Sequence, residues 1–191
     1  MRIESRIGIL GDIVGSGKSL MTVALLLMSD TGVFKPIYYS SDKYVNIISL
    51  TDSYIQSKIN LLIIPNHLID QWVDFFDYTD TLRIHLLTKN NVSDKEKGKI
   101  QKKNVNVIII PLNLVNEFFM LNPNTIWNRI IIDEADSIKI KQTDMLANFI
   151  WLITGTPSGI PTSKQSYIKA IFGKNINWIS DIILVKNNND Y

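Results

Sequence analysis

The sequence contains no cysteine. Disulfide bonds, thiolate metal sites and cysteine nucleophiles are therefore excluded, and the composition is compatible with a reducing compartment. The only two histidines, His67 and His85, lie far apart in the sequence, which excludes a zinc cage built from histidine. We expect both histidines to have structural roles rather than catalytic ones.

Long apolar runs and a strong net charge are also missing. No apolar run approaches the roughly 18 to 20 residues of a membrane span, and the N-terminus lacks the pattern of a signal peptide. Twenty Lys and Arg residues stand against 18 Asp and Glu residues, so the net charge of +2 does not by itself indicate a polyanionic partner. We therefore predict a soluble intracellular protein that does not bind membranes.

The composition that is present favours a folded chain, with 46% hydrophobic and 20% charged residues among 191. Short runs rich in Ile, Leu and Val are candidate strands at 7–10, 61–64, 105–110, 130–132, 150–153 and 182–185. Uniformly apolar runs of this length are typical of strands buried on both faces of a parallel sheet. Helical patterns at 18–29 and 66–78 alternate with them. We predict an α/β fold with a mainly parallel central sheet and helices on both faces.

A glycine-rich turn joins the first apolar run to the helical pattern that begins at Lys18. The residues expected to bind a nucleotide are Asp12, Ile13, Val14, Gly15, Ser16, Gly17, Lys18 and Ser19. Backbone N–H groups of such a turn and the helix N-terminus bind phosphate oxygens. Lys18 would reach the β- and γ-phosphates, and the Ser19 hydroxyl would bind Mg²⁺. The usual P-loop pattern has glycine where this chain has Asp12, and a merely structural turn is the alternative.

Two adjacent acids, Asp133 and Glu134, follow the apolar run 130–132. Because the carboxyl ends of parallel strands meet at one edge of a sheet, Asp133 should lie beside the glycine-rich turn and hold Mg²⁺. Glu134 would orient or deprotonate an attacking water. Acids at this position can instead cap a helix, but the glycine-rich turn favours catalytic roles for Lys18, Asp133 and Glu134.

Four segments resemble motifs of superfamily 2 helicases and translocases, in particular those of the Swi/Snf-like branch, and they follow one another along the chain in the order of motifs I, Ia, II and III. Residues 12–19 are similar to motif I of that branch, where an acid commonly begins the loop. Residues 61–65 and 68–72 resemble motif Ia, and 154–157 resemble motif III. Residues 133–136 spell motif II in its DEAD form, although the Swi/Snf-like branch more often ends this motif in His.

The resemblance implies the first RecA-like domain of such a motor, a three-layer P-loop fold over residues 1–191 with ATP and Mg²⁺ as cofactors. It implies that hydrolysis is coupled to strand movement through Asp136, Thr154, Gly155 and Thr156. It also implies a nucleic-acid partner, DNA favoured over RNA, that would be contacted by Pro65, Asn66, Gln71, Pro111 and Asn113. Without the family, the Thr154 to Pro157 segment could be only a turn.

The sequence also resembles the helicases and early transcription factors of large cytoplasmic DNA viruses. The resemblance rests on the Gly15-Ser16-Gly17 loop and on a composition rich in Ile, Asn and Lys. It would imply a location in the host cytoplasm or the virion.

The 34 residues after Pro157 contain no arginine. Superfamily 2 motors close the ATP site between two RecA-like lobes, and the second lobe supplies arginines that, in related phosphoryl transfer, are worth about 10³ to 10⁵ in rate. We therefore predict a single lobe that lacks the second one, requires it in cis or in trans, and hydrolyses ATP slowly alone. The alternative is a nucleotide-binding assembly or transcription-factor module without independent turnover. A P-loop GTPase or small-molecule kinase is disfavoured, because no Asn-Lys-x-Asp motif is present.

Three other features have weaker implications. Trp72 shares a helix face with apolar residues, so we expect it in the core rather than on a base-stacking surface. The lysine-rich stretch 95–103 is expected to be a solvated surface, although it could follow a phosphate backbone. Lys139 and Lys141 are equally plausible nucleic-acid contacts.

Overall fold

The structure, a computed structural model, describes residues 5–28, 37–42, 45–50, 54–90, 104–141, 145–172 and 184–185. Its strands are β1 (Ile7–Leu10), β2 (Ile37–Asp42), β3 (Val45–Leu50), β4 (Ile55–Gln56), β5 (Asn60–Ile64), β6 (Ile84–Leu86), β7 (Val107–Pro111), β8 (Thr125–Ile132), β9 (Ala147–Ile153) and β10 (Leu184–Val185). Its helices are α1 (Lys18–Leu27), α2 (Ile69–Phe76), α4 (Val115–Leu121) and α5 (Ser166–Phe172). Short 3-10 turns occur at Asn66–Leu68, Leu112–Leu114 and Pro157–Gly159.

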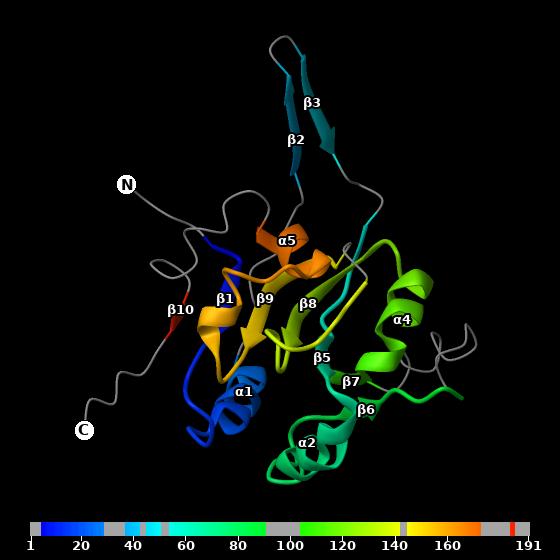
Figure 1. The fold of residues 1–191 in the computed structure, drawn as a ribbon. Coiled ribbons are helices and arrows are strands. Elements are labelled where there is room, and N and C mark those ends of the chain that lie inside the picture. The colour runs from blue at the N-terminus through cyan, green and yellow to red at the C-terminus, as the bar shows by residue number, and fades with distance from the viewer. Residues whose placement is uncertain are drawn as a thin grey trace.

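The main sheet has the strand order β10-β1-β9-β8-β5-β7-β6, and β4 adds to it by pairing with β8. Each pairing among these described strands is parallel. Strands β2 and β3 instead form a separate antiparallel hairpin, which Figure 1 shows projecting away from the sheet. Because the main strands are parallel, the loops that follow β1, β5, β7, β8 and β9 meet at one edge of the sheet.

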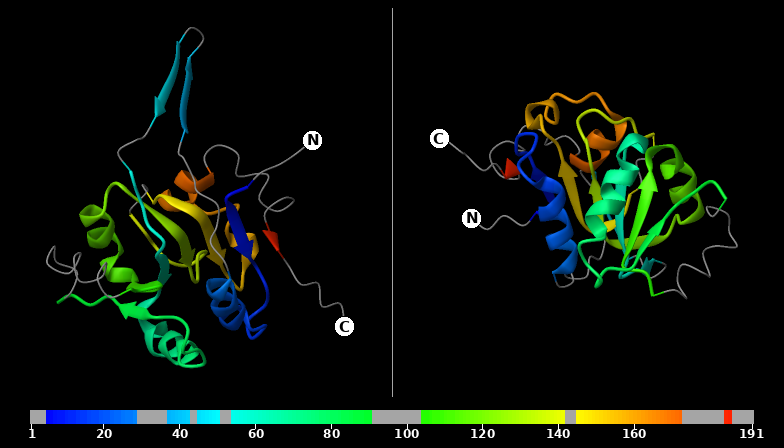
Figure 2. Two further views of the ribbon diagram at one scale, coloured as in Figure 1. Left: turned by 180° about the vertical axis from the view of Figure 1, so that it is seen from behind. Right: turned by 90° about the horizontal axis from the view of Figure 1, so that it is seen from below.

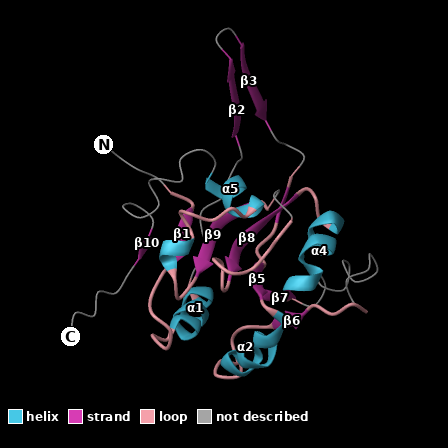
Figure 3. Ribbon diagram, in the orientation of Figure 1, coloured by secondary structure: helices cyan, strands magenta, loops and turns pink. Residues whose placement is uncertain are grey.

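Helices cover both faces of the sheet, which gives three layers (Figures 2 and 3). All residues of β5 and β7 are buried, as the uniformly apolar runs predicted. Successive residues point to opposite faces, so Leu61 packs in the cluster that contains α4 and α5, and Leu62 packs in the cluster that contains α1 and α2. The predicted α/β fold with a mainly parallel sheet is confirmed.

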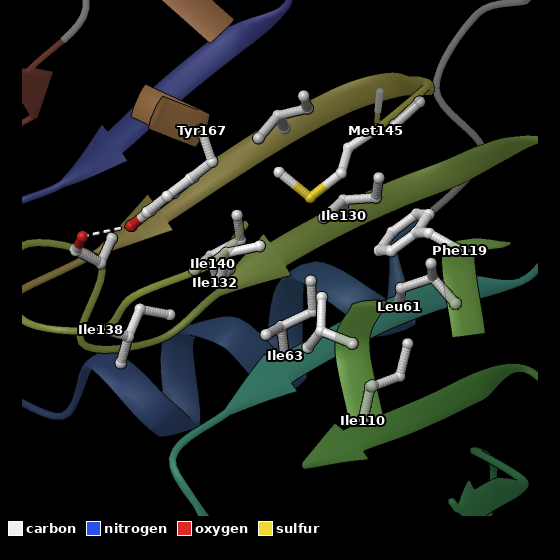
Figure 4. Close-up of a cluster of buried hydrophobic side chains, with 14 of the residues drawn as sticks. Leu61, Ile63, Ile110, Phe119, Ile130, Ile132, Ile138, Ile140, Met145 and Tyr167 are labelled. Atoms are coloured by element: carbon white, nitrogen blue, oxygen red, sulfur yellow. Dashed lines mark hydrogen bonds between the residues drawn. The ribbon is translucent and has the colours of Figure 1, made fainter. Parts of the chain in front are cut away.

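The cluster on the α4 and α5 side forms a continuous core (Figure 4). Ile130 and other residues of β8 pack there against Phe119 of α4, against Met145, which precedes β9, and against Tyr167 of α5. Tyr167 is completely buried. A buried tyrosine hydroxyl needs a hydrogen-bond partner. The Tyr167 hydroxyl donates to the carbonyl oxygen of Ala135, which directly follows β8 and its two acids. The core therefore anchors the segment that carries the acids.

Strand β8 begins at Thr125, well before the predicted run at 130–132. The sequence pattern missed the added residues because they include buried polar side chains. Asn128 Nδ2 donates to Asn60 Oδ1 at 2.9 Å, and Arg129 Nη1 donates to the same oxygen at 3.4 Å. Partnered polar groups can lie inside a strand, which a search for apolar runs misses. β9 likewise begins at Ala147 rather than at 150.

Other predicted bounds also differ from the structure. The helical pattern at 66–78 splits into a 3-10 turn and α2, because the Leu68 N–H bonds the Pro65 carbonyl at 3.0 Å and tightens the first turn. The hairpin β2–β3 was not predicted, since its sequence is not uniformly apolar. The lysine-rich stretch 95–103 lies outside the described residues. None of the helices in the described part of the chain has the length and apolar character needed to cross a membrane.

Candidate active site

The glycine-rich turn lies between β1 and α1 and exposes its backbone. Gly15 and Gly17 have φ values of +84° and +83°, in the left-handed region that favours glycine. Apart from its neighbours along the chain, no heavy atom of the described residues lies within 4 Å of the position of a Cβ at either glycine, so backbone conformation rather than crowding requires glycine. Gly17 is the N-cap residue of α1, and no side chain among the described residues caps that end. The turn therefore presents N–H groups at a helix N-terminus that can bind an anion.

Lys18 folds back onto this turn. Its Nζ donates hydrogen bonds to the carbonyl oxygens of Asp12 and Ile13, each at 2.8 Å. Asp12 is 4% exposed, and Lys18 and Ser19 are half-buried in the first turn of α1. The sequence thus places an ammonium and a hydroxyl beside the exposed N–H groups, which is the donor set that a polyphosphate requires.

Asp133 follows β8 and is almost buried, at 8% exposed. Its Oδ1 accepts the backbone N–H of Glu134 at 2.9 Å, and its Oδ2 accepts the indole N–H of Trp72 at 2.8 Å. Burial raises the pKa of the Asp133 carboxyl, although these two hydrogen bonds act in the opposite direction. Electrostatic interactions with Lys18 and His67 also lower the pKa of Asp133, so both side chains lie close to this carboxyl.

Glu134 adopts a backbone conformation that is uncommon for a residue with a side chain, with φ at +51°. Burial raises the pKa of its carboxyl, and so do the negative charges of Asp133 and Asp136. The charges of Lys18 and His67 lower the pKa of Glu134, as they do at Asp133. The structure thus brings the turn with Lys18 and both acids together at the carboxyl edge of the sheet, although β9 separates β1 from β8.

Asp136 connects the acidic segment to the turn that follows β9. Thr154 Oγ1 donates to Asp136 Oδ1 at 2.5 Å, and the Thr156 hydroxyl donates to Asp136 Oδ2. Thr154 Oγ1 also accepts the backbone N–H of Thr156 at 2.9 Å. Both hydroxyls thus bond to the same carboxyl group, one to each oxygen. The Thr154 to Pro157 segment is therefore a turn bound to the acidic segment by its side chains.

Gly155 brings the same turn against the glycine-rich loop. A Cβ at Gly155 would lie 3.0 Å from Val14 Cγ2, closer than ordinary van der Waals contact. The loops after β1, β8 and β9 therefore form one contiguous group at the edge of the sheet.

Of the five residues expected to face nucleic acid, Pro65 and Asn66 directly follow β5, and Gln71 lies in α2. Pro111 ends β7, and Asn113 follows it. Pro65 and Pro111 are buried, whereas Asn66, Gln71 and Asn113 are exposed. Pro111 pairs with Ile64 in the register of the two strands, so the loops that follow leave the sheet side by side. Exposed side chains from both loops are thus available to a partner at one edge.

Sequence reasoning missed the hydrogen bond of Trp72. Its predicted core position is confirmed, since Trp72 is 1% exposed and has no surface on which a base could stack. The available signal was chemical, because a buried indole N–H normally requires an acceptor. His67 is exposed and lies near the two acids, a proximity that only the three-dimensional structure shows, and its expected structural role stays a prediction.

Comparison with known proteins identifies the family. The profile of the SNF2-related domain matches residues 2–164. The chain belongs to the SNF2-related domain family. This SNF2-related domain is 25% identical to a candidate helicase of Acanthamoeba polyphaga mimivirus, in an alignment that covers 99% of the chain and 30% of that protein. It is 28% identical to the DNA repair protein RAD5 of Candida glabrata, where 78% of the chain matches 16% of the relative.

The fold has a solved counterpart in the helicase domain of Pyrococcus furiosus Hef, with a TM-score of 0.54 and 16% sequence identity. The match covers 97% of this chain and 35% of that one. The SNF2-related domain is thus a RecA-like lobe of the superfamily 2 helicase type, in its Swi/Snf-like branch. It spans less than a third of the length of either curated relative.

Proposed function

We propose that this SNF2-related domain binds ATP with Mg²⁺ at the carboxyl edge of its sheet, and that it supplies the hydrolytic acids of a nucleic-acid motor. The observation that carries the proposal is that Lys18, Asp133 and Glu134 lie together at the carboxyl edge of the sheet. The charge of Lys18 lowers the pKa of both acids. The family and its helicase relatives support the use of ATP.

The residues present fit ATP and Mg²⁺. The left-handed glycines and the uncapped start of α1 provide donors for the phosphates, beside the Lys18 ammonium. In the described part of the chain, no three His, Cys, Asp or Glu residues cluster as a metal site. Mg²⁺ usually takes only one or two protein ligands, with phosphate oxygens and waters, so Ser19 and Asp133 suffice. When bound, Mg²⁺ would neutralise charge on the phosphates.

Glu134 is the proposed residue that orients the attacking water and accepts its proton. A general base needs a pKa closer to neutrality than that of an exposed carboxylate, and burial with two acidic neighbours raises the pKa of Glu134 in that direction. Its uncommon backbone conformation directs the side chain differently from that of an ordinary turn residue. Such backbone conformations are frequent at active sites.

Asp136, Thr154, Gly155 and Thr156 are the proposed connection between hydrolysis and movement. The hydrogen bonds of Asp136 join the acidic segment to the turn after β9, and that turn lies so near the proposed phosphate loop that a Cβ at Gly155 would be 3.0 Å from Val14 Cγ2. A displacement of the loop on hydrolysis would therefore reach this turn through direct contacts.

The proposed partner is nucleic acid, bound along the loops after β5 and β7. The exposed side chains of Asn66, Gln71 and Asn113 are the contacts, while the buried Pro65 and Pro111 shape the loops. DNA is favoured over RNA, because the relative RAD5 is named as a DNA repair protein. A second RecA-like lobe, in cis or in trans, is proposed to complete the ATP site, so we expect slow hydrolysis by the isolated chain.

Calorimetric titration with ATP and Mg²⁺ tests the nucleotide site. The wild-type chain should bind ATP more tightly than GTP, and Lys18→Ala should weaken ATP binding about tenfold or more, since it removes a charged hydrogen-bond donor. Lys58→Ala, which removes an exposed lysine just before β5, is the matched control and should bind normally. Equal ATP affinity in Lys18→Ala and the wild type would contradict the proposal. Rapid nucleic-acid-stimulated turnover by the isolated chain would contradict the need for a second lobe.

A module that binds nucleotide for assembly or transcription, without turnover, is the second candidate function. This candidate uses the same proposed nucleotide site and differs from a motor in having no hydrolytic step. Capture of a protein partner that depends on ATP, without hydrolysis even when a second lobe is supplied, would favour this function. The mimivirus relative supports a viral setting, with action in the host cytoplasm or virion.

A further inference from the structure

The hydrogen bond between Trp72 and Asp133 joins two elements that are distant in the sequence. Trp72 lies on the buried face of α2, where its ring contacts those of Phe75 and Phe76 at centroid distances of 6.0 and 6.3 Å. Its indole Nε1–H donates to Asp133 Oδ2 at 2.8 Å, in a fully buried contact. The two rings limit the freedom of the indole, so the donor has a defined direction.

The carboxylate of Asp133 is held by one donor on each oxygen. Oδ1 accepts the backbone N–H of Glu134, and Oδ2 accepts the Trp72 indole. The first donor belongs to the same segment as Asp133 and moves with it. Trp72 is therefore the donor that fixes the carboxylate relative to the rest of the fold. A carboxylate oxygen that accepts one hydrogen bond keeps a second lone pair for a metal ion.

We propose that Trp72 is a positioning residue that orients the Asp133 carboxylate for the Mg²⁺ accompanying ATP. The inference rests on the proposed function, which makes Asp133 a metal ligand. Partners that hydrogen-bond a metal ligand typically change metal affinity or activity about 10- to 100-fold when they are removed. The proposal also connects α2 to the metal site, because Trp72 lies on that helix. Exposed Gln71, a candidate nucleic-acid contact, directly precedes Trp72.

Trp127 offers a matched control in the buried cluster on the opposite face of the sheet. It lies on β8, the strand that leads to Asp133, and is 5% exposed. Its ring packs against Phe118 at a centroid distance of 5.3 Å. In the described part of the chain, its Nε1 has no hydrogen-bond partner. Trp127→Phe and Trp72→Phe therefore remove the same atoms from buried sites, but only Trp72→Phe removes a hydrogen bond to Asp133.

The test measures ATP binding to the 191-residue chain by calorimetry while the Mg²⁺ concentration is varied. We expect Trp72→Phe to raise the Mg²⁺ concentration for half-maximal enhancement of ATP binding about tenfold or more. ATP affinity in EDTA should change less than about twofold, because the phosphate loop is untouched. Trp127→Phe should leave the Mg²⁺ dependence unchanged. Equal Mg²⁺ dependence in the two variants would overturn the proposal.

Two further measurements separate positioning from structural damage. Urea unfolding of each variant establishes that it is folded, and benzothienylalanine in place of Trp72 removes the N–H while keeping the bicyclic shape. This replacement should shift the Mg²⁺ dependence as Trp72→Phe does, and an unchanged Mg²⁺ dependence would overturn the proposal. In an Asp133→Asn background, Trp72→Phe should add no further shift, whereas a full additional shift would overturn it. Failure of the wild-type chain to bind ATP with Mg²⁺ would instead overturn the proposed function.

Discussion

The glycine-rich turn at 13–17, which is the proposed phosphate loop, and the acidic segment at 133–136 lie at the same edge of the sheet, but different forces hold them. The loop is exposed, with Ile13 at 73% and Val14 at 86%, and its shape depends on left-handed glycines and backbone carbonyls that bind Lys18. The acidic segment is bound by side chains from other elements. They include Trp72, Thr154, Thr156, Gln165 and Tyr167.

The difference predicts how each region responds to mutation. A segment held by its own backbone should be sensitive to changes in allowed φ and insensitive to its exposed side chains. A segment held by buried side chains should lose stability when one hydrogen-bonding atom is removed from a distant element. Chemistry on the bound nucleotide is expected from the acidic segment, and binding from the loop.

The largest expected effect is that of Glu134→Gln, which separates chemistry from binding. Loss of a general base typically lowers turnover about 10²- to 10⁴-fold. ATP affinity should change little, and stability should not fall, because the neutral amide avoids the repulsion from Asp133 and Asp136 that raises the pKa of Glu134. Single-turnover phosphate release and urea unfolding measure the two effects. Exposed Glu117→Gln is the control, and an equal rate in the two variants would remove Glu134 from catalysis.

Thr154→Val tests the side-chain support of the acidic segment. The change keeps the shape but removes a buried hydroxyl that donates to Asp136 and accepts the Thr156 N–H. We expect the free energy of unfolding to fall by about 2 kcal/mol, as for the loss of two hydrogen bonds. Thr156→Val, at a more exposed position, should cost about half as much. Urea denaturation measures both, and equal losses would contradict the distinction between buried and exposed partners.

Gly17→Ala tests the backbone support of the loop. In the described part of the chain, the added methyl group would meet no atom beyond its chain neighbours, so the cost is that of a left-handed alanine, about 1 to 2 kcal/mol. Relaxation of the loop should weaken ATP binding about tenfold. Gly8→Ala gives the contrast, because its methyl group would lie 2.4 Å from the Trp151 ring. That variant should lose stability through overpacking, whereas a larger loss of ATP affinity in Gly8→Ala than in Gly17→Ala would contradict backbone control.

Gly155→Ala has the smallest expected effect and tests the contact between the two regions. The added methyl group would press on Val14, whose exposed side chain can move, so the cost should be below about 1 kcal/mol. The displaced loop should bind ATP slightly less tightly. Val14→Ala in the same chain should restore the affinity, and calorimetry that shows no restoration would place the effect elsewhere.

The features that the sequence predicted are those encoded by neighbouring residues. The phosphate loop is encoded by consecutive residues, from Asp12 to Ser19, so its location between β1 and α1 followed directly from the pattern. The parallel sheet followed from uniformly apolar runs such as that of β5. Both features depend on residues that are close together in the sequence.

The supports of the acidic segment could not be predicted in the same way. Trp72 and Asp133 are 61 positions apart, and Tyr167 lies 32 positions from Ala135. Apolar periodicity identifies each ring as buried but does not say which acceptor its polar atom meets. The early start of β8 was missed for a related reason, since Asn128 is tolerated there through its bond to Asn60.

Amide hydrogen exchange of the isolated chain, with and without ATP and Mg²⁺, tests the central claim most directly. The N–H groups of the first turn of α1 lack intrahelical partners, so bound phosphates should slow their exchange. We predict protection confined to residues 13–20 and the segment 133–136, and its loss in Lys18→Ala. Protection at the opposite edge of the sheet, around Asn60 and Arg129, or equal protection in Lys18→Ala, would contradict the account.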